Sequence, residues 1–260
     1  MADRLNKKNT DAWLDKLKPA NSNTRISVGG RVIAQAVPSV MPGSPGNLGL
    51  TSDRLRMRMV QRVRAQGVTH EAVLEALGAI ARHRFVDQAL ASRAYEDGAL
   101  PIGHGQTISQ PWVVARMLAA LCEPEIPRKV LEIGTGCGYQ AAVMSRIFAQ
   151  VFTIERVRPL YDMARARLQE MAMRNVQCMF GDGMLGWHSK APFDAIVVAA
   201  AGLSIPQTLL DQLAVGGKLI APEGDTNQRL IMVTRESAHQ WVRIELESVR
   251  FVPLKPGVQT

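Results

Sequence analysis

The sequence has few cysteines, few aromatic residues and no long apolar run. Its 260 residues include 3 cysteines, and 5% of them are aromatic. The cysteines are widely spaced (Cys122, Cys137 and Cys178) and form no Cys-x-x-Cys pair, which argues against a disulfide framework and a zinc site. The longest uninterrupted apolar stretch, from Ala195 to Leu203, is far shorter than the roughly 20 residues that a membrane helix needs.

An apolar signal segment is also missing near the start of the sequence. Residues 1–20 carry charges where a signal peptide would need hydrophobic side chains. With reduced thiols and no membrane helix expected, we predict a cytoplasmic protein that has no contact with a membrane. The composition, 47% hydrophobic and 21% charged, is that of a globular chain with a sizeable core.

The net charge of +8 is spread unevenly along the chain. Residues 1–50 contain 7 Lys/Arg and 3 Asp/Glu, residues 51–94 contain 8 and 4, and residues 95–260 contain 16 of each. All of the excess charge therefore lies in the N-terminal third. Because salt screens such charges over about 8 Å under physiological conditions, an anionic partner such as nucleic acid would be attracted only to that end.

Residues 1–51 are predicted to form a basic, disordered extension. Between Pro19 and Asp53 the chain is rich in Asn, Ser, Gly and Pro, and it shows neither helical nor strand periodicity. The preceding stretch Asp11–Lys18 could form a short amphipathic helix, but two turns are marginal alone. A second hypothesis about the chain is that this extension is a binding module for nucleic acid or another anionic surface.

The remaining residues, 52–260, are predicted to form one domain that begins with helices. Apolar side chains recur at helical spacing from Ser52 onward, and a second helix start is expected at Thr69. The arginines between Arg54 and Arg64 are interpreted as a solvated helix face rather than as a nucleic-acid site. We assign these helices and the active-site segment to residues 52–125.

Residues 126–260 alternate strand and helix patterns, which is typical of an α/β fold with a parallel sheet and crossover helices. The last two strands, Arg229–Thr234 and Trp241–Val252, follow each other across a turn too short for a crossover, so they should pair antiparallel. The other expected strands are 130–133, 151–154, 176–180, 195–199 and 218–221, and the expected helices are 139–148 and 159–173.

A nucleotide site is predicted where the stretch VLEIGTGCGYQ runs from a strand into a helix. Its glycines, Gly134, Gly136 and Gly138, allow positive φ and close approach of a ligand to the backbone. Glu155 ends the next strand, 21 positions after Gly134, where a carboxylate can accept from both ribose hydroxyls. The alternative for Glu155 is an exposed acid that pairs with a neighbouring arginine.

Three further residues favour S-adenosylmethionine over a dinucleotide. Tyr139 occupies the position that dinucleotide sites keep small, and Glu132 could hold a positively charged group of the ligand. Asp182, in the sequence Gly-Asp-Gly, could read the adenine amino group through its side chain or through neighbouring backbone. The alternative for Asp182 is a plain turn residue.

The stretch PIGHGQTISQPW has two interpretations. Pro111 suits the first turn of a helix, which Ser109 or Gln110 would then cap. Alternatively, these hydroxyls and the free amides of that turn hold an anionic group. His104, between two glycines, is interpreted as a loop residue with a conformational role and not as a catalytic base.

Over roughly Ser52–Gly257, the chain resembles the protein-L-isoaspartate O-methyltransferases. The most specific motifs are LPIGHGQTISQPWVVARM and VRFVPL, and they accompany VLEIGTGCGYQ, PFDAIVVAAA and LAVGGKLIAPEG. Typical members lack the N-terminal extension. The resemblance implies a Rossmann-like S-adenosylmethionine-dependent methyltransferase sheet, mostly parallel with an antiparallel C-terminal strand pair, plus N-terminal helices.

The resemblance also implies the substrate, the cofactor and the site residues. The substrate would be the free carboxylate of an L-isoaspartyl residue in a damaged protein, and the methyl ester would cyclise to a succinimide. Ser109 falls on the family's active-site serine, with Thr107 and Gln110 as candidate substrate donors; no metal is expected. The residues expected to bind S-adenosylmethionine are Ile108, Glu132, Gly134, Thr135, Gly136, Gly138, Glu155, Asp182 and Gly183.

The absence of a catalytic acid–base pair agrees with this chemistry. A carboxyl group with a pKa of about 3.9 is already an anionic nucleophile at neutral pH, so no general base is needed. The rival substrates are another carboxylate or a nucleic acid. Against the latter, the chain has Ala199–Gly202 where nucleic-acid methyltransferases carry an Asn/Asp-Pro-Pro-Tyr type of loop.

Overall fold

The computed structural model describes residues 48–260. Most of the predicted extension, with the helix considered over Asp11–Lys18, lies outside the described residues. The first described helix, α2 (Leu48–Ala65), begins before Ser52, so the expected boundary at residue 52 falls inside it. No helix in the described range is both long and apolar enough to cross a membrane.

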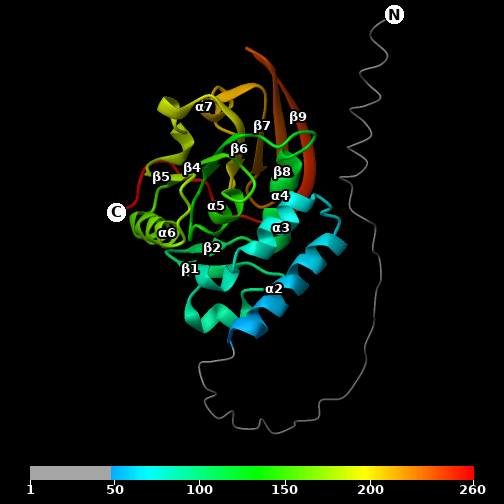
Figure 1. Ribbon diagram of the computed structural model, residues 1–260. Helices are drawn as coiled ribbons and strands as arrows, with labels where there is room; N and C mark the ends of the chain where they lie inside the picture. Colours follow the sequence, from blue (N-terminus) through cyan, green and yellow to red (C-terminus); the bar gives the residue numbers. More distant parts are fainter. Residues whose placement is uncertain (1–47) are drawn as a thin grey trace, which may run out of the picture.

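Helix α2 packs against α3 (Glu71–Ala79), and both lie on the same side of the molecule as the short strands β1 and β2 (Figure 1). The expected apolar face of α2 is confirmed by Met59 and Val63, which are fully buried. The expected start of α3 at Thr69 was one residue early, because the cap position is His70 and no side chain caps this helix.

Several arginines of α2 are bonded within the protein. Arg56 Nε donates to the carbonyl of Gly78 at 2.7 Å, and Arg62 Nη2 donates to the carbonyl of Tyr95 at 2.6 Å. Arg64 makes an exposed two-fold contact with the carboxylate of Glu71. The exposed Arg54, Arg58 and Arg64 agree with the predicted solvated face, whereas Arg56 and Arg62 are half-buried and bond the fold.

A seven-stranded sheet forms the centre of the domain (Figure 1). The strand order is β5-β4-β3-β6-β7-β8-β9; the first five strands are parallel, and β8 and β9 are antiparallel to their neighbours. The predicted fold class is thus confirmed. The strands are β3 (Lys129–Ile133), β4 (Gln150–Glu155), β5 (Val176–Phe180), β6 (Phe193–Val198), β7 (Leu213–Glu223), β8 (Gln228–Ser237) and β9 (Gln240–Val249).

Alternating side chains of the strands build two hydrophobic cores on opposite faces of the sheet. In β3, Val130 joins the core shared with the N-terminal helices, whereas Leu131 and Ile133 join the core shared with α7. Burial on both faces explains why the central strands are mostly apolar, with Glu132 and Thr153 as buried polar exceptions. The helices on these faces are α4 (Pro111–Leu121), α5 (Tyr139–Met144), α6 (Arg158–Glu170) and α7 (Gln207–Leu210).

The motif that precedes α4 is a β-hairpin, which the sequence analysis did not predict. Strands β1 (Leu100–Gly103) and β2 (Gln106–Ile108) pair antiparallel. His104 and Gly105 form the turn with φ of 52° and 69°, so His104 has the conformational role expected of it. Pro111 then opens α4 as expected.

Candidate active site

A cavity lies at the carboxyl ends of the central strands, above β3 and its neighbours β4 and β6. It has about 840 Å³ of empty space, a figure that includes its open mouth. The strand order changes direction at β3, because β4 and β5 lie on one side of it and β6 and β7 on the other. α/β sheets bind ligands at such points. The wall is formed by residues 106–109, 133–137, 139–140, 154–157, 199–200 and 252–255, with Val114 and Gly183.

The glycine turn has the backbone geometry predicted for it. Gly134, Gly136 and Gly138 have φ of 92°, 55° and 89°. A Cβ on Gly136 would lie 3.2 Å from Ile102 of the hairpin, and one on Gly138 would lie 3.3 Å from Ala164 of α6. Gly134 and Gly136 line the cavity, whereas Gly138 lies behind the wall and lets α5 approach α6.

Glu155 is fixed on the cavity wall by two backbone amides. Its Oε2 accepts from Gly136 N at 2.8 Å, and its Oε1 accepts from Val157 N at 2.9 Å. The residue is 5% exposed, and neither oxygen pairs with an arginine, so the alternative of an exposed paired acid is wrong. Each carboxylate oxygen keeps a further lone pair, which suits two adjacent hydroxyls of a ribose.

Glu132 lies beneath the cavity and not on its wall. The side chain is fully buried, and its Oε2 accepts from the Thr153 hydroxyl at 2.6 Å. Thr153 in turn bonds the hydroxyl of Thr135, which does line the cavity. Burial, reinforced by the nearby Glu155, raises the pKa of Glu132 to about 8. Direct pairing of Glu132 with a positively charged ligand group, as expected from the sequence, has no support in this geometry.

The carboxylate of Asp182 is occupied by backbone amides. Oδ1 accepts from Met184 N at 2.8 Å, and Oδ2 accepts from Gly257 N at 2.7 Å. The side chain therefore has the structural role that was the alternative in the sequence analysis. Gly183 lies on the cavity wall, so the neighbouring backbone remains the candidate for reading an adenine ring.

The predicted strip Thr107–Ser109 lies on the cavity wall, facing the glycine turn. Ser109 is half-buried, and its hydroxyl makes no hydrogen bond with the described part of the chain. The cap position of α4 is Gln110, without a side-chain cap, so capping does not explain these residues. Gln110 does not line the cavity; its amide donates to Asp97 at 2.8 Å, which leaves its expected contact with substrate without support.

The C-terminal segment also forms part of the site, which the sequence did not predict. We call residues 252–259 the strap, because they leave β9 and cross the carboxyl ends of the parallel strands. Leu254 N donates to the carbonyl of Ala201 at 2.7 Å, and Gln259 exchanges backbone hydrogen bonds with the residues around Val157. The C-terminus lies beside β5 and α6 (Figure 1). The only signal in the sequence was the motif VRFVPL, which marked the family but not a role.

The cavity suits a ligand that brings its own reactive group. Burial raises the pKa of the Cys137 thiol on the wall, which keeps it neutral, and no metal-binding group of His, Cys, Asp or Glu side chains occurs within residues 48–260. The glycine turn and Glu155 fit the adenosine and amino-acid parts of S-adenosylmethionine. Thr107 and Ser109 line the same cavity.

Comparison with known sequences agrees with this geometry. The model of the protein-L-isoaspartate(D-aspartate) O-methyltransferase family matches residues 54–259. A protein-L-isoaspartate O-methyltransferase of Bordetella parapertussis is 62% identical over 245 residues, covering 94% of each chain. Because 245 of the 260 residues are covered, this relative also matches part of the N-terminal extension, which typical members were expected to lack.

Solved structures point the same way. A protein-L-isoaspartate O-methyltransferase structure superposes with a TM-score of 0.71 at 27% identity, covering 78% of this chain and 67% of its own. One described as this enzyme from Plasmodium falciparum, in complex with S-adenosyl-L-homocysteine, gives 0.68 at 25% identity, covering 77% and 98%. This chain belongs to the protein-L-isoaspartate(D-aspartate) O-methyltransferase family.

Proposed function

We propose that the protein transfers the methyl group of S-adenosylmethionine to the free carboxylate of L-isoaspartyl residues in damaged proteins and peptides. The observation that carries this proposal is the shared cavity: Glu155 and the glycine turn form one wall, and the Thr107–Ser109 strip forms another. A methyl donor and an anionic acceptor held on these walls would lie within reach of each other. Membership of the family supports the choice of substrate.

The residues that would hold the cofactor are Glu155, which is fixed by two backbone amides, and the glycine turn. Glu155 would accept from the ribose hydroxyls, and the backbone around Gly134 and Gly136 would lie against the amino-acid part. When bound, S-adenosylmethionine supplies an electrophilic methyl group on a sulfonium. Apolar Ile133 and Ile154 flank this place and keep water from it.

The protein's part in the reaction is to align and partly desolvate an existing nucleophile. The substrate carboxylate is ionised at neutral pH, so no residue has to take up a proton. Ser109 Oγ is the donor that orients this carboxylate, with Thr107 Oγ1 beside it. Neutral hydroxyls suit the task better than a buried arginine, since a carboxylate held too tightly in the ground state reacts more slowly. Such positioning can lower the barrier by up to about 7–11 kcal/mol.

The product is released with its carboxylate converted to a methyl ester. The carbonyl of an ester is a better electrophile than a carboxylate, so the nitrogen of the neighbouring backbone amide can attack it. This attack expels methanol, which takes up the amide proton, and closes a succinimide without help from the protein. The partners are therefore isoaspartyl-containing polypeptides. We place the protein in the cytoplasm, where its three free thiols would stay reduced.

The decisive experiment compares two peptides that differ only in the linkage of one residue. Purified protein and isotopically labelled S-adenosylmethionine are incubated with an isoaspartyl peptide and with its aspartyl twin. We expect label in a base-labile ester on the isoaspartyl peptide alone. Equal labelling of both peptides, or labelling of an added nucleic acid instead, would reject the proposal.

A further inference from the structure

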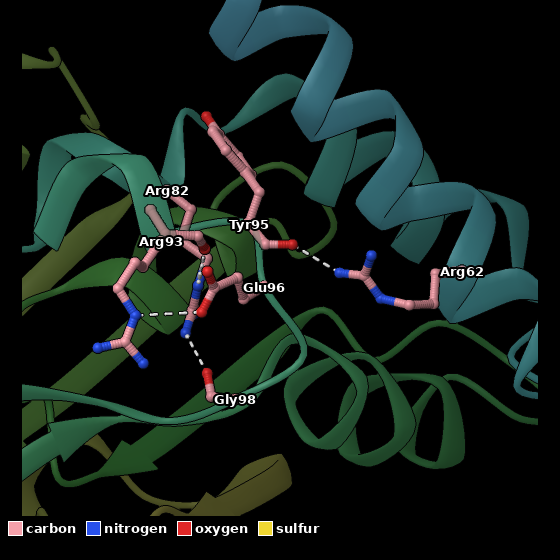
Figure 2. Close-up of polar contacts among 7 residues, drawn as sticks. Arg62, Arg82, Arg93, Tyr95, Glu96 and Gly98 are labelled. Atoms are coloured by element: carbon pink, nitrogen blue, oxygen red, sulfur yellow. Dashed lines mark hydrogen bonds and ion pairs between the residues drawn. The ribbon is translucent and has the colours of Figure 1, made fainter. Parts of the chain in front are cut away.

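Arg82 is fully buried and reaches the segment that leads into the active-site hairpin. Its Nε donates to the carbonyl of Ala94 at 2.8 Å, and its Nη2 lies 3.5 Å from the carbonyl of Gly98 (Figure 2). We call residues 94–98 the connecting segment, because β1 begins two residues after Gly98, at Leu100. The hairpin that starts there ends in the strip that carries Thr107 and Ser109.

The same guanidinium also contacts the cofactor turn. Its Cζ lies 4.8 Å from the centroid of the Tyr139 ring, in a cation–π arrangement. Tyr139 is the first residue of α5 and lies on the cavity wall. Phe85 packs edge-on against the same ring, with 5.5 Å between the centroids. Arg82 therefore contacts two segments next to the cavity: the connecting segment, which leads into the hairpin, and Tyr139, which follows the glycine turn.

Stability alone does not explain an arginine at this place. Arg82 has no carboxylate partner among the described residues, and its Nη1 has no hydrogen-bond partner. Burial of a cation without a counter-charge is costly, and an apolar side chain of similar length avoids that cost. The planar guanidinium of arginine, however, can donate hydrogen bonds along one edge while its face stacks on an aromatic ring. The ammonium group of lysine cannot make both contacts.

Two other arginines also bond this region, and Asp97 accepts from Gln110. Arg62 of α2 donates to the carbonyl of Tyr95, and Arg93 pairs with Glu96 at the surface (Figure 2). Neither arginine contacts the cofactor turn in these interactions. Arg82 thus contacts both the connecting segment and Tyr139 through one guanidinium group.

We propose that Arg82 is a positioning residue, which sets the distance and orientation of the Ser109 hydroxyl relative to the cofactor turn. The inference rests on the proposed methyl transfer, for which the two walls must be aligned. It predicts a defect in turnover rather than in cofactor binding, because Glu155 and the turn backbone keep their own contacts.

The test uses the full chain with Arg82→Lys, which keeps the charge and removes the fork. At saturating cofactor and isoaspartyl peptide, kcat should fall about 10- to 100-fold, as expected for a small misplacement of reacting groups. The affinity and stoichiometry of S-adenosylhomocysteine binding should stay close to those of the wild type. Arg93→Lys, the same change at an exposed pair just before the connecting segment, should leave kcat unaltered.

Coupling to Ser109 separates positioning from general weakening of the fold. If Arg82 acts through Ser109, Arg82→Lys should reduce kcat much less in a Ser109→Ala background than in the wild type. The proposal is overturned if Arg82→Lys has the kcat of the wild type, or if the change lowers kcat by the same factor in both backgrounds. It is also overturned if the decrease in kcat equals the decrease in the number of S-adenosylhomocysteine sites. If Arg82→Lys does not fold, Arg82→Met replaces it, and failure of both to fold also overturns the proposal. A wild-type protein that methylates no isoaspartyl peptide would instead refute the proposed function.

Discussion

At the scale of single residues, Ser109 is the side chain closest to the proposed chemistry. Replacing it with alanine removes one donor to a charged carboxylate, worth about 1.5–3 kcal/mol, so kcat should fall about 10- to 100-fold. The affinity for S-adenosylhomocysteine, measured by calorimetry, should hardly change, because Glu155 and the glycine turn are untouched. Wild-type kcat in Ser109→Ala would mean that the hydroxyl takes no part in the reaction.

Glu132 makes a prediction about pH. Its pKa is raised from 4.5 to about 8 in the folded protein because burial disfavours the charged form. The protonated acid therefore stabilises the fold fully below pH 4.5, and this contribution is lost as the pH rises towards 8. We expect the free energy of unfolding to fall over this range, by at most about 1.4 kcal/mol per pH unit from this group.

The variant Glu132→Gln tests this assignment, since glutamine resembles the protonated acid and its carbonyl can still accept from Thr153. Denaturant unfolding at several pH values should show a flatter profile than the wild type and a more stable protein near pH 8. Glu170→Gln, at a side chain that is 69% exposed, should keep the wild-type slope. A Glu132→Gln profile parallel to that of the wild type would refute the raised pKa.

The sequence predicted correctly the residues whose contacts lie within one local motif. It failed for residues whose hydrogen-bond partners lie in another segment of the chain. Glu155 follows its strand and meets the glycine turn in the way that this local motif dictates. Gln110 and Asp182 were given roles by position, but their side chains bond Asp97 and Gly257. Such partners depend on how the hairpin and the strap pack, which periodicity does not encode.

At the scale of elements, the glycine turn joins β3 to α5 and also sets how closely α5 lies to α6. Gly138→Ala should lower stability for two reasons: its φ of 89° is strained for alanine, by about 1–2 kcal/mol, and its Cβ would lie 3.3 Å from Ala164. Crowding of this kind adds about 1–3 kcal/mol. Thermal or denaturant unfolding measures the sum.

Gly67→Ala is the matched control for this element. Gly67 also has a positive φ, of 100°, but nothing lies within 4 Å of the Cβ it would acquire. Gly67→Ala should therefore lose stability only through strain at the positive φ, and the loss should be clearly smaller than that of Gly138→Ala. Equal losses would show that α5 and α6 can move apart at no cost, and that Gly138 matters only for the turn.

The elements predicted best were those with strong hydrophobic periodicity. The strand Val176–Phe180 was predicted with its observed bounds, and the antiparallel C-terminal pair was also correct. The hairpin of β1 and β2 was missed because its strands are short and contain Pro101, which weakens a strand signal. Its turn residues, His104 and Gly105, were noticed only as part of a loop.

At the scale of the whole molecule, the charge is asymmetric, and half of the net +8 comes from residues before 48. Deleting residues 1–47, which leaves α2 whole, should lower the salt concentration that elutes the protein from an anionic matrix. Methyl transfer should be unaffected, because no residue of the proposed site lies in that range. Measuring elution and kcat on the same preparations tests both statements.

A full-length variant separates the effect of charge from that of chain length. Changing Lys7, Lys8, Lys16 and Lys18 to glutamine should weaken retention about as the deletion does. If both variants elute like the wild type, the extension is not the basic binding module that its composition suggests. Retention would then depend on the arginines of α2.

By itself, the sequence determined the α/β class, the glycine turn with its acidic partner and the family, because these follow from short, contiguous patterns of side-chain size, periodicity and chemistry. Only the tertiary structure decided that Glu132 is buried beneath the site, that the strap closes over it and that Arg82 joins its two supports. The physical reason is that burial and hydrogen-bond partners across the sheet arise from contacts between segments far apart in the chain. The alignment of Ser109 with the cofactor turn depends on those contacts.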